Sequence, residues 1–375
     1  MTRRYVFKRR WKRIAMSVFD AAGRLLLFWS RPRVAASPPT SILVVRIDQV
    51  GDVIQSLPFF ESLRRKYPTC RIMALCVEDS AFLLRGNPNV DEVVALRTSW
   101  FYPGRSASWR DLYRTFRAIR LSKPDLTFEL RGDLRTLLFL AVSGARNIHG
   151  YGCAGGGFLL SQEYDYDREQ HEVDKNLRML GESSPAFTKI GFPSDGSAEA
   201  EAATILRNGG RGKKIAIHPF SNAPSKMWGM DRYGALIDKI SAQCAEAVFF
   251  VLGSPEDSSF MNDLRNRRGV VDCTGQLSFR GTLELIKRAD LFIGNDSAPQ
   301  YLAAYTGIRT CIIYGYSVNF LRWKPKVPDG TLVTLSKPVY CGPCESSVCA
   351  NHREGHICME RISVDDVFER LKDWL

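Results

Sequence analysis

Charged side chains that could act as a catalytic base or bind an anion stand shortly after strand-like apolar runs. One of them is Asp52, in the stretch ILVVRIDQVGDVIQSLP at residues 42–58. The apolar run 42–45, followed by Arg46, is typical of a buried strand in a parallel sheet, and the loop through Gly51 leads into a helix. Such a corner binds anions because backbone N–H groups point out of the helix N-terminus. A carboxylate there either caps the helix or acts as a catalytic base at the carboxyl edge of the sheet.

Three further stretches have the same character: PDLTFELRGDLRT at 124–136, HPFSNAPSKMW at 218–228 and IGNDSAPQYLAAYTG at 293–307. Each follows or contains a strand-like run, so its polar residues are expected at a sheet edge. Helix capping and a solvated surface lysine are the simpler interpretations of these residues. A further candidate, Glu256, follows the apolar run that ends at residue 252. The three stretches supply the other candidate site residues, which are Glu129, Arg131, Ser221, Lys226, Asp296, Ser297 and Ala298.

Two series of alternating strand-like and helix-like stretches must position these residues. The first runs from 42 to 182 and the second from 214 to 314. Such alternation predicts parallel sheets with helices on both faces, and 375 residues suit two domains of this size. We therefore expect an α/β protein with a basic N-terminal segment and linker at 1–40, one domain at 41–182, a connection at 183–212 and a second domain at 213–375.

Positive charge is concentrated at the N-terminus. Residues 1–33 hold ten Lys/Arg and one Asp, which is +9 of the net +12, so a basic nucleic-acid-binding face on the domains has no support. Within this segment Trp11, Val18 and Leu25 share one helical face with other apolar residues, opposite a basic face. This pattern fits a helix lying on an anionic membrane, a helix packed on its own domain, or a disordered tail.

No apolar run reaches the ~18 residues needed to span a bilayer, and no cleavable leader is evident. We expect a soluble, cytoplasmic body with reduced thiols.

The ten cysteines fall into two groups. Six are scattered in apolar runs and are interpreted as small core residues. The other four, Cys341, Cys344, Cys349 and Cys358, lie in a loop-rich stretch at 341–358 with His352 and His356. The C-x₂-C spacing with two further thiols suggests structural zinc, although the C-x₈-C half departs from a paired knuckle. Reduced or disulfide-bonded thiols are the alternative.

From about residue 41 to the C-terminus, the four stretches resemble glycosyltransferase family 9, the heptosyltransferases of lipopolysaccharide core assembly and their relatives. They match, in order, the family's G-D pair, its D-x-R-G-x-x-R-S, its H-P-G-S with K-x-W, and its D-S-G-P-x-H-L-A-A-x-x-G. The resemblance implies a GT-B fold, two Rossmann-like doubly wound domains facing a cleft. The acceptor would bind the N-terminal domain and the nucleotide-sugar the C-terminal domain.

The same resemblance implies roles for individual residues. Asp52 would be the general base, Glu129 and Arg131 would lie on the acceptor side, and the remaining candidates would bind the donor. Among the donor residues, Ser221 and Lys226 would contact the phosphates, Glu256 the ribose, and Asp296, Ser297 and Ala298 the diphosphate. Ala298 and Tyr301 stand where the family commonly has Gly and His, so the donor could differ from ADP-heptose. No D-x-D pair appears in a plausible loop, so no catalytic metal or other cofactor is implied.

The resemblance implies an inverting glycosyltransferase that moves a sugar, most simply heptose from ADP-heptose, onto lipopolysaccharide or another lipid-linked acceptor. The enzyme would be peripheral on the inner face of the inner membrane, attached through residues 1–33. Two alternatives stay open: another nucleotide-sugar enzyme such as a UDP-sugar epimerase, and a non-catalytic nucleotide-sugar-binding membrane scaffold.

Overall fold

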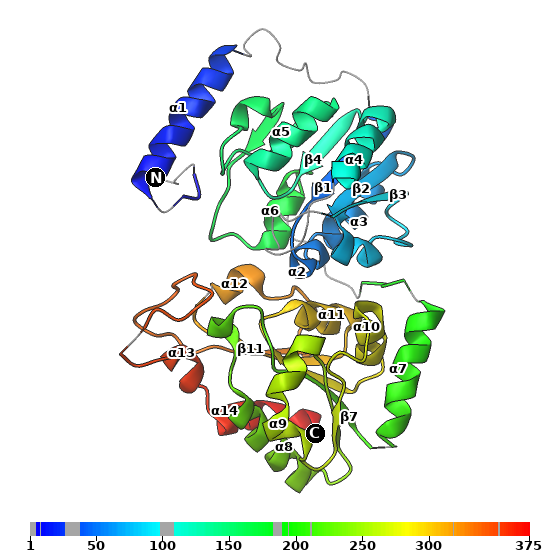
Figure 1. The fold of residues 1–375 in the computed structure, drawn as a ribbon, viewed down its shortest axis with the longest axis vertical. Helices are drawn as coiled ribbons and strands as arrows, with labels where there is room; N and C mark the ends of the chain where they lie inside the picture. Colours follow the sequence, from blue (N-terminus) through cyan, green and yellow to red (C-terminus); the bar gives the residue numbers. More distant parts are fainter. Residues whose placement is uncertain are drawn as a thin grey trace. The chain divides into compact units, whose positions relative to one another are not determined.

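The computed structural model describes residues 5–7, 9–26, 38–97, 109–182, 190–193, 195–210, 212–317, 319–351 and 353–375. The chain divides into two compact units, residues 1–185 and 186–375. Each unit contains one six-stranded parallel sheet with helices packed against it (Figure 1). The α/β fold with two Rossmann-like halves is therefore confirmed.

The sheet of the first unit has the order β3-β2-β1-β4-β5-β6, with every neighbouring pair parallel. Its strands are β1 Ser41–Arg46, β2 Arg71–Val77, β3 Glu92–Leu96, β4 Leu126–Glu129, β5 Ile148–Tyr151 and β6 Gln162–Tyr164. Its helices are α1 Arg10–Leu26, α2 Val50–Ile54, α3 Leu57–Lys66, α4 Trp109–Ser122, α5 Leu134–Ser143 and α6 Glu172–Arg178, with 3₁₀ turns η2 Glu78–Leu83 and η3 Gly157–Leu159. The central strand β1 is apolar and buried along most of its length. Leu43 and Val45 of β1 pack with Ile119 of α4 and Leu140 of α5, so these two helices cover one face of the sheet.

The sheet of the second unit has the order β12-β11-β10-β7-β8-β9, also parallel throughout. Its strands are β7 Lys214–His218, β8 Val248–Val251, β9 Val270–Asp272, β10 Leu291–Asn295, β11 Arg309–Ile313 and β12 Leu332–Leu335. Its helices are α7 Gly196–Asn208, α8 Met230–Gln243, α9 Asn262–Arg265, α10 Phe279–Lys287, α11 Ala298–Thr306, α12 Phe320–Trp323, α13 Ile357–Glu360 and α14 Val364–Leu371, with 3₁₀ turns η4 Pro224–Lys226, η5 Pro255–Phe260 and η6 Lys372–Trp374.

Helix α7 lies within the stretch 183–212 that the sequence suggests as a connection. It packs on α10, and Asp195 at its N-cap pairs with Arg280 while Glu201 accepts from Ser278. This helix is therefore part of the second unit.

The helix expected after the Gly51 turn is broken in two. Helix α2 ends at Ile54 and α3 begins at Leu57, with Pro58 in the first turn of α3. Proline has no N–H to donate and its ring clashes with the carbonyl of residue i−4, so one continuous helix cannot pass through Pro58. Three basic residues, Arg64–Lys66, lie in the last turn of α3, where the helix dipole favours them.

Helix α1 packs on the first unit through its polar side. Asp20 is buried and accepts hydrogen bonds from the Tyr5 hydroxyl at 2.9 Å and the Gly156 N–H at 2.8 Å. Gly23 lies against the ring of Phe158, where an added Cβ would come within 2.5 Å of a ring carbon. The apolar residues on the opposite side of α1, including Trp11, are therefore left exposed.

Candidate active site

Both sheets have the doubly wound strand order, which reverses direction between β1 and β4 in the first unit and between β7 and β10 in the second. Open α/β sheets bind ligands outside the carboxyl ends of strands at such a switch point. In the first unit the chain leaving β1 and β4 carries Asp52, Glu129 and Arg131. In the second unit, Ser221 and Lys226 follow β7, and Asp296, Ser297 and Ala298 follow β10. The remaining candidate, Glu256, follows β8.

The Asp52 side chain pairs with a buried arginine. Its Oδ1 lies 3.3 Å from Arg46 Nη2, and 18% of the Asp52 side chain is exposed against 2% of Arg46. Gln49, and not Asp52, is the N-cap of α2, and no side-chain capping bond is made there. The structure therefore gives Asp52 an ion pair with Arg46 in place of the capping role that the sequence also allowed.

Arg46 gathers three carboxylates at this edge. Its Nη2 lies 3.1 Å from Glu172 Oε1 and 3.5 Å from Asp48 Oδ2, in addition to Asp52. Its Nη1 donates to the Leu130 carbonyl at 2.8 Å. Burial acts to lower the Arg46 pKa, but these carboxylates raise it overall, so the guanidinium stays charged.

Helix α6 supplies a second buried ion pair to the cluster. Glu172 Oε2 lies 2.5 Å from Lys175 Nζ, and both side chains are buried. The Lys175 ammonium also lies 4.2 Å from the centre of the Tyr166 ring, a cation–π distance. Neither Glu172 nor Lys175 was identified from the sequence. In the sequence they are an ordinary i,i+3 pair at the start of a helix, and nothing there indicates the contact of Glu172 with Arg46, which lies 126 positions earlier.

The two acceptor-side candidates join the same cluster. Arg131 Nη1 lies 2.6 Å from Asp48 Oδ1 and donates to the Ile47 carbonyl at 3.3 Å. Glu129 is buried at the end of β4 and accepts from the Gly132 N–H. The structure thus brings Asp52, Glu129 and Arg131 to one edge of one sheet.

The electrostatics of this edge favour a base that titrates near neutrality. Burial, reinforced by the charge of Asp48 and opposed by Arg46, raises the pKa of Asp52 to about 7. Burial also raises the pKa of Glu129 to about 7, opposed by the Gly132 hydrogen bond. A carboxylate with a pKa close to the working pH is well suited to take a proton from a hydroxyl group.

In the second unit, Lys226 and Asp296 form an ion pair at the switch point. Their Nζ and Oδ2 atoms lie 2.6 Å apart, with 27% of the lysine side chain exposed and 5% of the aspartate. Asp296 Oδ1 accepts from Gln300 Nε2 at 2.9 Å. Ser221 Oγ donates to the Asp296 carbonyl at 3.5 Å. The structure therefore brings together the three residues Ser221, Lys226 and Asp296, which come from two loops.

Buried polar contacts hold these two loops. Asn295, at the end of β10, donates to the Pro219 carbonyl at 2.5 Å and accepts from the Tyr233 hydroxyl at 3.0 Å. Ser297 Oγ lies 3.0 Å from His218 Nδ1. Burial lowers the His218 pKa to about 4, so the neutral ring can accept the hydroxyl proton of Ser297. Ser297 is the N-cap of α11 and Ala298 its first residue.

Glu256 lies apart from the Lys226–Asp296 pair. It is exposed in the 3₁₀ turn η5, which follows β8. The capping box of that turn is made by Ser254 and Asp257. The Glu256 carboxylate also accepts hydrogen bonds from its own backbone N–H and from the Ser254 hydroxyl, which lower its pKa, so it takes part in the same turn.

The four C-terminal cysteines are free thiols that line one small cavity with His356. Cys349 Sγ donates to the Gly355 carbonyl at 3.4 Å, and Cys341 is exposed. Among the described residues, which leave out His352, no three His, Cys, Asp or Glu side chains are arranged to hold a metal ion. The structure therefore gives no support to the zinc site that the spacing left open, and it agrees with the alternative that these cysteines are free thiols.

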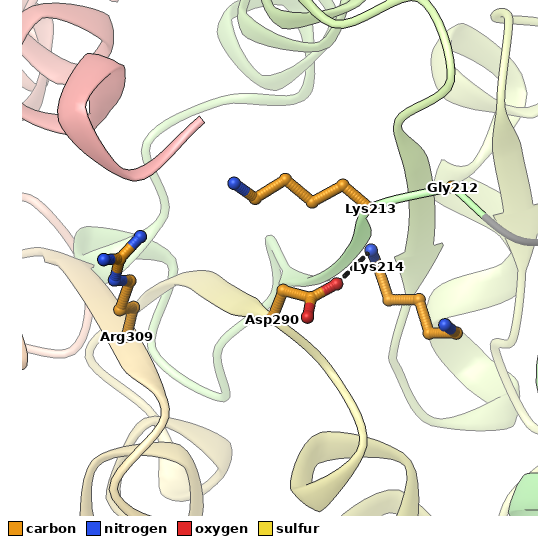
Figure 2. Close-up of a pocket in the computed structure, with 5 residues that line it drawn as sticks. All are labelled: Gly212, Lys213, Lys214, Asp290 and Arg309. Carbon is orange, nitrogen blue, oxygen red and sulfur yellow. Dashed lines mark hydrogen bonds between the residues drawn. The ribbon is translucent and has the colours of Figure 1, made fainter.

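A larger open cavity of about 580 Å³ lies elsewhere in the second unit (Figure 2). It is lined by Gly212, Lys213, Lys214, Asp290 and Arg309, and Asp290 accepts from the Lys214 backbone N–H at 2.8 Å. These residues stand at or just before the first residues of β7, β10 and β11, which is the amino edge of the sheet. The cavity is therefore at the edge opposite the switch point and contains none of the candidate residues.

Two doubly wound units with polar clusters at both switch points are typical of α/β proteins that bind nucleotide-type ligands. Residues 112–353 match the model of glycosyltransferase family 9 (heptosyltransferase), and the chain belongs to this family. The protein is a glycosyltransferase.

Relatives of known name agree with this assignment. The chain is 22% identical over 298 residues to lipopolysaccharide heptosyltransferase 3 of Escherichia coli, covering 73% of this chain and 83% of that protein. A family 9 glycosyltransferase from Veillonella parvula superposes with a TM-score of 0.76 at 20% identity, covering 89% and 97% of the two chains. The E. coli ADP-heptose lipopolysaccharide heptosyltransferase II superposes with a TM-score of 0.70 at 16% identity, covering 89% and 98%. These superpositions confirm the GT-B fold.

Proposed function

We propose that this enzyme is an inverting glycosyltransferase that transfers heptose from ADP-heptose to a lipopolysaccharide core or similar lipid-linked acceptor, with Asp52 as the general base. The observation that carries the proposal is the Asp52 carboxylate at the switch point, beside the buried Arg46 and with a pKa of about 7. The names of the relatives support the donor and the acceptor class. No cofactor forms part of the proposal.

The proposed chemical step is a single displacement. Asp52 takes the proton of an acceptor hydroxyl while that oxygen forms a bond to the anomeric carbon of the sugar. The bond from the same carbon to the diphosphate oxygen breaks, which inverts the configuration and releases the nucleoside diphosphate. A placed carboxylate contributes about 10²–10⁴-fold to such a proton transfer.

The leaving diphosphate gains negative charge, which Lys226 and Ser221 would hold in this proposal. Lys226 is partly exposed, so its ammonium can contact a diphosphate while it stays close to Asp296. The N-terminus of α11, with Ser297 and Ala298, would face the same group, and Glu256 would accept from the ribose. Glu129 and Arg131 would contact or position the acceptor in the first unit.

The Lys226→Gln variant tests the phosphate role. A hydrogen bond to a charged group contributes about 1.5–3 kcal/mol, so kcat/KM should fall by about 10- to 150-fold. The matched control is Lys239→Gln, which removes a lysine from an ion pair with Asp365 on the same unit. Equal activity of the two variants would contradict a phosphate contact for Lys226.

A transfer assay with a panel of nucleotide sugars tests the proposed function itself. ADP-heptose should stabilise the protein against heat, by about 2.7 kcal/mol at a hundredfold excess over Kd, and should donate its sugar only when acceptor is present. Conversion of the donor without acceptor would favour an epimerase. Absence of stabilisation by every nucleotide sugar would favour a non-catalytic scaffold.

We further propose that the enzyme works on the cytoplasmic face of the inner membrane, attached through the exposed apolar side of α1. None of the helices in the described part of the chain combines the length and apolar character needed to cross a bilayer. Because α1 docks through Asp20 and Gly23, its opposite side presents Trp11, Ile14 and Val18, each at least 60% exposed. The arginines near its start suit anionic headgroups.

Replacing Trp11, Ile14 and Val18 together by Ser should weaken binding to acidic vesicles and leave turnover of a water-soluble acceptor unchanged. These substitutions leave the contacts between α1 and the first unit in place, whereas deletion of residues 1–33 would remove them. A loss of vesicle binding can therefore be assigned to the exposed apolar side of α1. Vesicle flotation measures the binding. Flotation equal to that of the unmodified enzyme would reject the attachment.

A further inference from the structure

The outer side of helix α4 is a basic and aromatic surface that the proposed reaction does not use. The inner side packs on the sheet through the buried residues Thr115 and Ile119. At about 100° per residue, the exposed positions occupy roughly 140° of the helix circumference. We call these seven residues the α4 outer face: Trp109, Arg110, Tyr113, Arg114, Arg117, Arg120 and Leu121.

Charge on the α4 outer face has one sign. The only acidic residue of the helix, Asp111, is half-buried and pairs with Arg114 at 3.4 Å. Within the described ranges of the chain, no ion pair is made by Arg110, Arg117 or Arg120. Three guanidinium groups with no ion pair among the described residues give this side of the helix a positive potential, which favours an anionic partner.

Large apolar side chains are interleaved with these arginines. Trp109 is 85% exposed, Tyr113 is 65% and Leu121 is 70%. Trp and Tyr combine an apolar ring with a polar atom and prefer the headgroup level of a bilayer, while arginine reaches the headgroups from a partly buried stem. The three apolar side chains together favour a lipid surface, because a bilayer offers both anionic headgroups and an apolar layer beneath them.

Neighbouring helices continue the same character. Helix α5 packs beside α4 and contacts the turn η3, which α1 also contacts, and Figure 1 shows the three helices in a row across the first unit. The outer side of α5 exposes Leu138 and Val142. The exposed apolar residues of α1, α5 and α4 therefore lie on consecutive helices of one unit.

We propose that the α4 outer face is a second membrane contact, which binds the headgroup region of an anionic lipid bilayer. This inference extends the attachment proposed for α1, and it does not depend on Asp52 or on the identity of the sugar. Two contacts on one unit would hold the acceptor-side domain against the lipid surface more strongly than a single helix, because the second contact forms at high effective concentration once the first is made.

The test uses the full chain and vesicles of equal parts phosphatidylglycerol and phosphatidylcholine. The charge variant replaces Arg110, Arg117 and Arg120 by Gln, and at about 1 kcal/mol per basic residue its partition coefficient should fall on the order of 100-fold. A second variant, Trp109→Ser with Tyr113→Ser, should also bind more weakly. The matched control replaces the exposed residues Arg268, Arg353 and Arg361 of the second unit by Gln, with no change in binding expected.

The outcomes separate this proposal from its competitors. A charge variant that binds vesicles as tightly as the control variant overturns it. Tight binding of heparin by the unmodified enzyme, together with failure to bind the vesicles, also overturns it and assigns the surface to a polyanion. Turnover of a water-soluble acceptor should be unchanged in both α4 variants, whereas Asp52→Asn should bind vesicles normally, so failure of the catalytic proposal would be seen separately.

Discussion

Asp52→Asn should lower kcat by about 10²–10⁴-fold while the protein stays folded. The asparagine oxygen can still accept from Arg46, so the packing at the carboxyl edge of the first sheet is kept and only the proton-accepting function is lost. Steady-state kinetics with saturating donor and acceptor measure the loss. Activity within a few-fold of the unmodified enzyme would remove Asp52 from the chemical step.

The same variant should be more stable than the unmodified enzyme at alkaline pH. The folded state raises the Asp52 pKa from its ordinary 3.8 to about 7, so the stability contributed by this group is fully present below about pH 4 and is lost as the pH rises through 7. At about 1.4 kcal/mol per pKa unit, the gain at pH 8 is a few kcal/mol at most. Thermal unfolding of both proteins at pH 4 and pH 8 checks the sign, because the difference should vanish at the lower pH.

Arg46→Met should damage both stability and activity. Loss of one partner from a buried ionic cluster costs about 3–5 kcal/mol, because Asp48, Asp52 and Glu172 would then share the site without the guanidinium. The Asp52 pKa would rise further in the folded state, because the Arg46 charge lowers it, so the stability deficit should grow with pH. Urea unfolding at two pH values measures this effect, and an Arg46→Lys variant should recover part of it.

Arg46 also controls the ionisation of the proposed base. The Asp52 carboxylate must be ionised to accept a proton, so kcat/KM should rise with pH through about 7 in the unmodified enzyme. Removal of Arg46 should move this limb to higher pH. Glu172→Gln should move it to lower pH, because Glu172 is one of the charges that raise the Asp52 pKa. Movement of both profiles in the same direction would contradict this electrostatic account.

Much of the fold could be predicted because it depends on local patterns. The apolar runs at 42–45 and 291–293 form most of the central strands β1 and β10, so the polar residues that follow them emerge at the carboxyl edges of the sheets. The edge strands β6 and β12 were not predicted, since both are short and largely half-exposed. The break at Pro58 follows from the chemistry of proline and could have been expected.

The contacts that were missed all depend on tertiary structure. Glu172 meets Arg46 only because α6 returns to the end of β1. The docking side of α1 was not evident either, because Asp20 and Gly23 would ordinarily be assigned to solvent. The spacing of Cys341 and Cys344 left a structural metal open beside reduced or disulfide-bonded thiols, and among the described residues these thiols do not form a ligand set.

The close approach of Gly23 to Phe158 gives the N-terminal attachment a direction. A flexible amphipathic tail would hold its domain near the lipid surface without fixing the orientation of the domain. A helix clamped by a glycine against a ring, and by Asp20 against Tyr5 and Gly156, cannot roll about its own axis without breaking those contacts. The orientation of the first unit at a lipid surface that α1 contacts would therefore depend on Gly23, where an added Cβ would lie 2.5 Å from a ring carbon of Phe158.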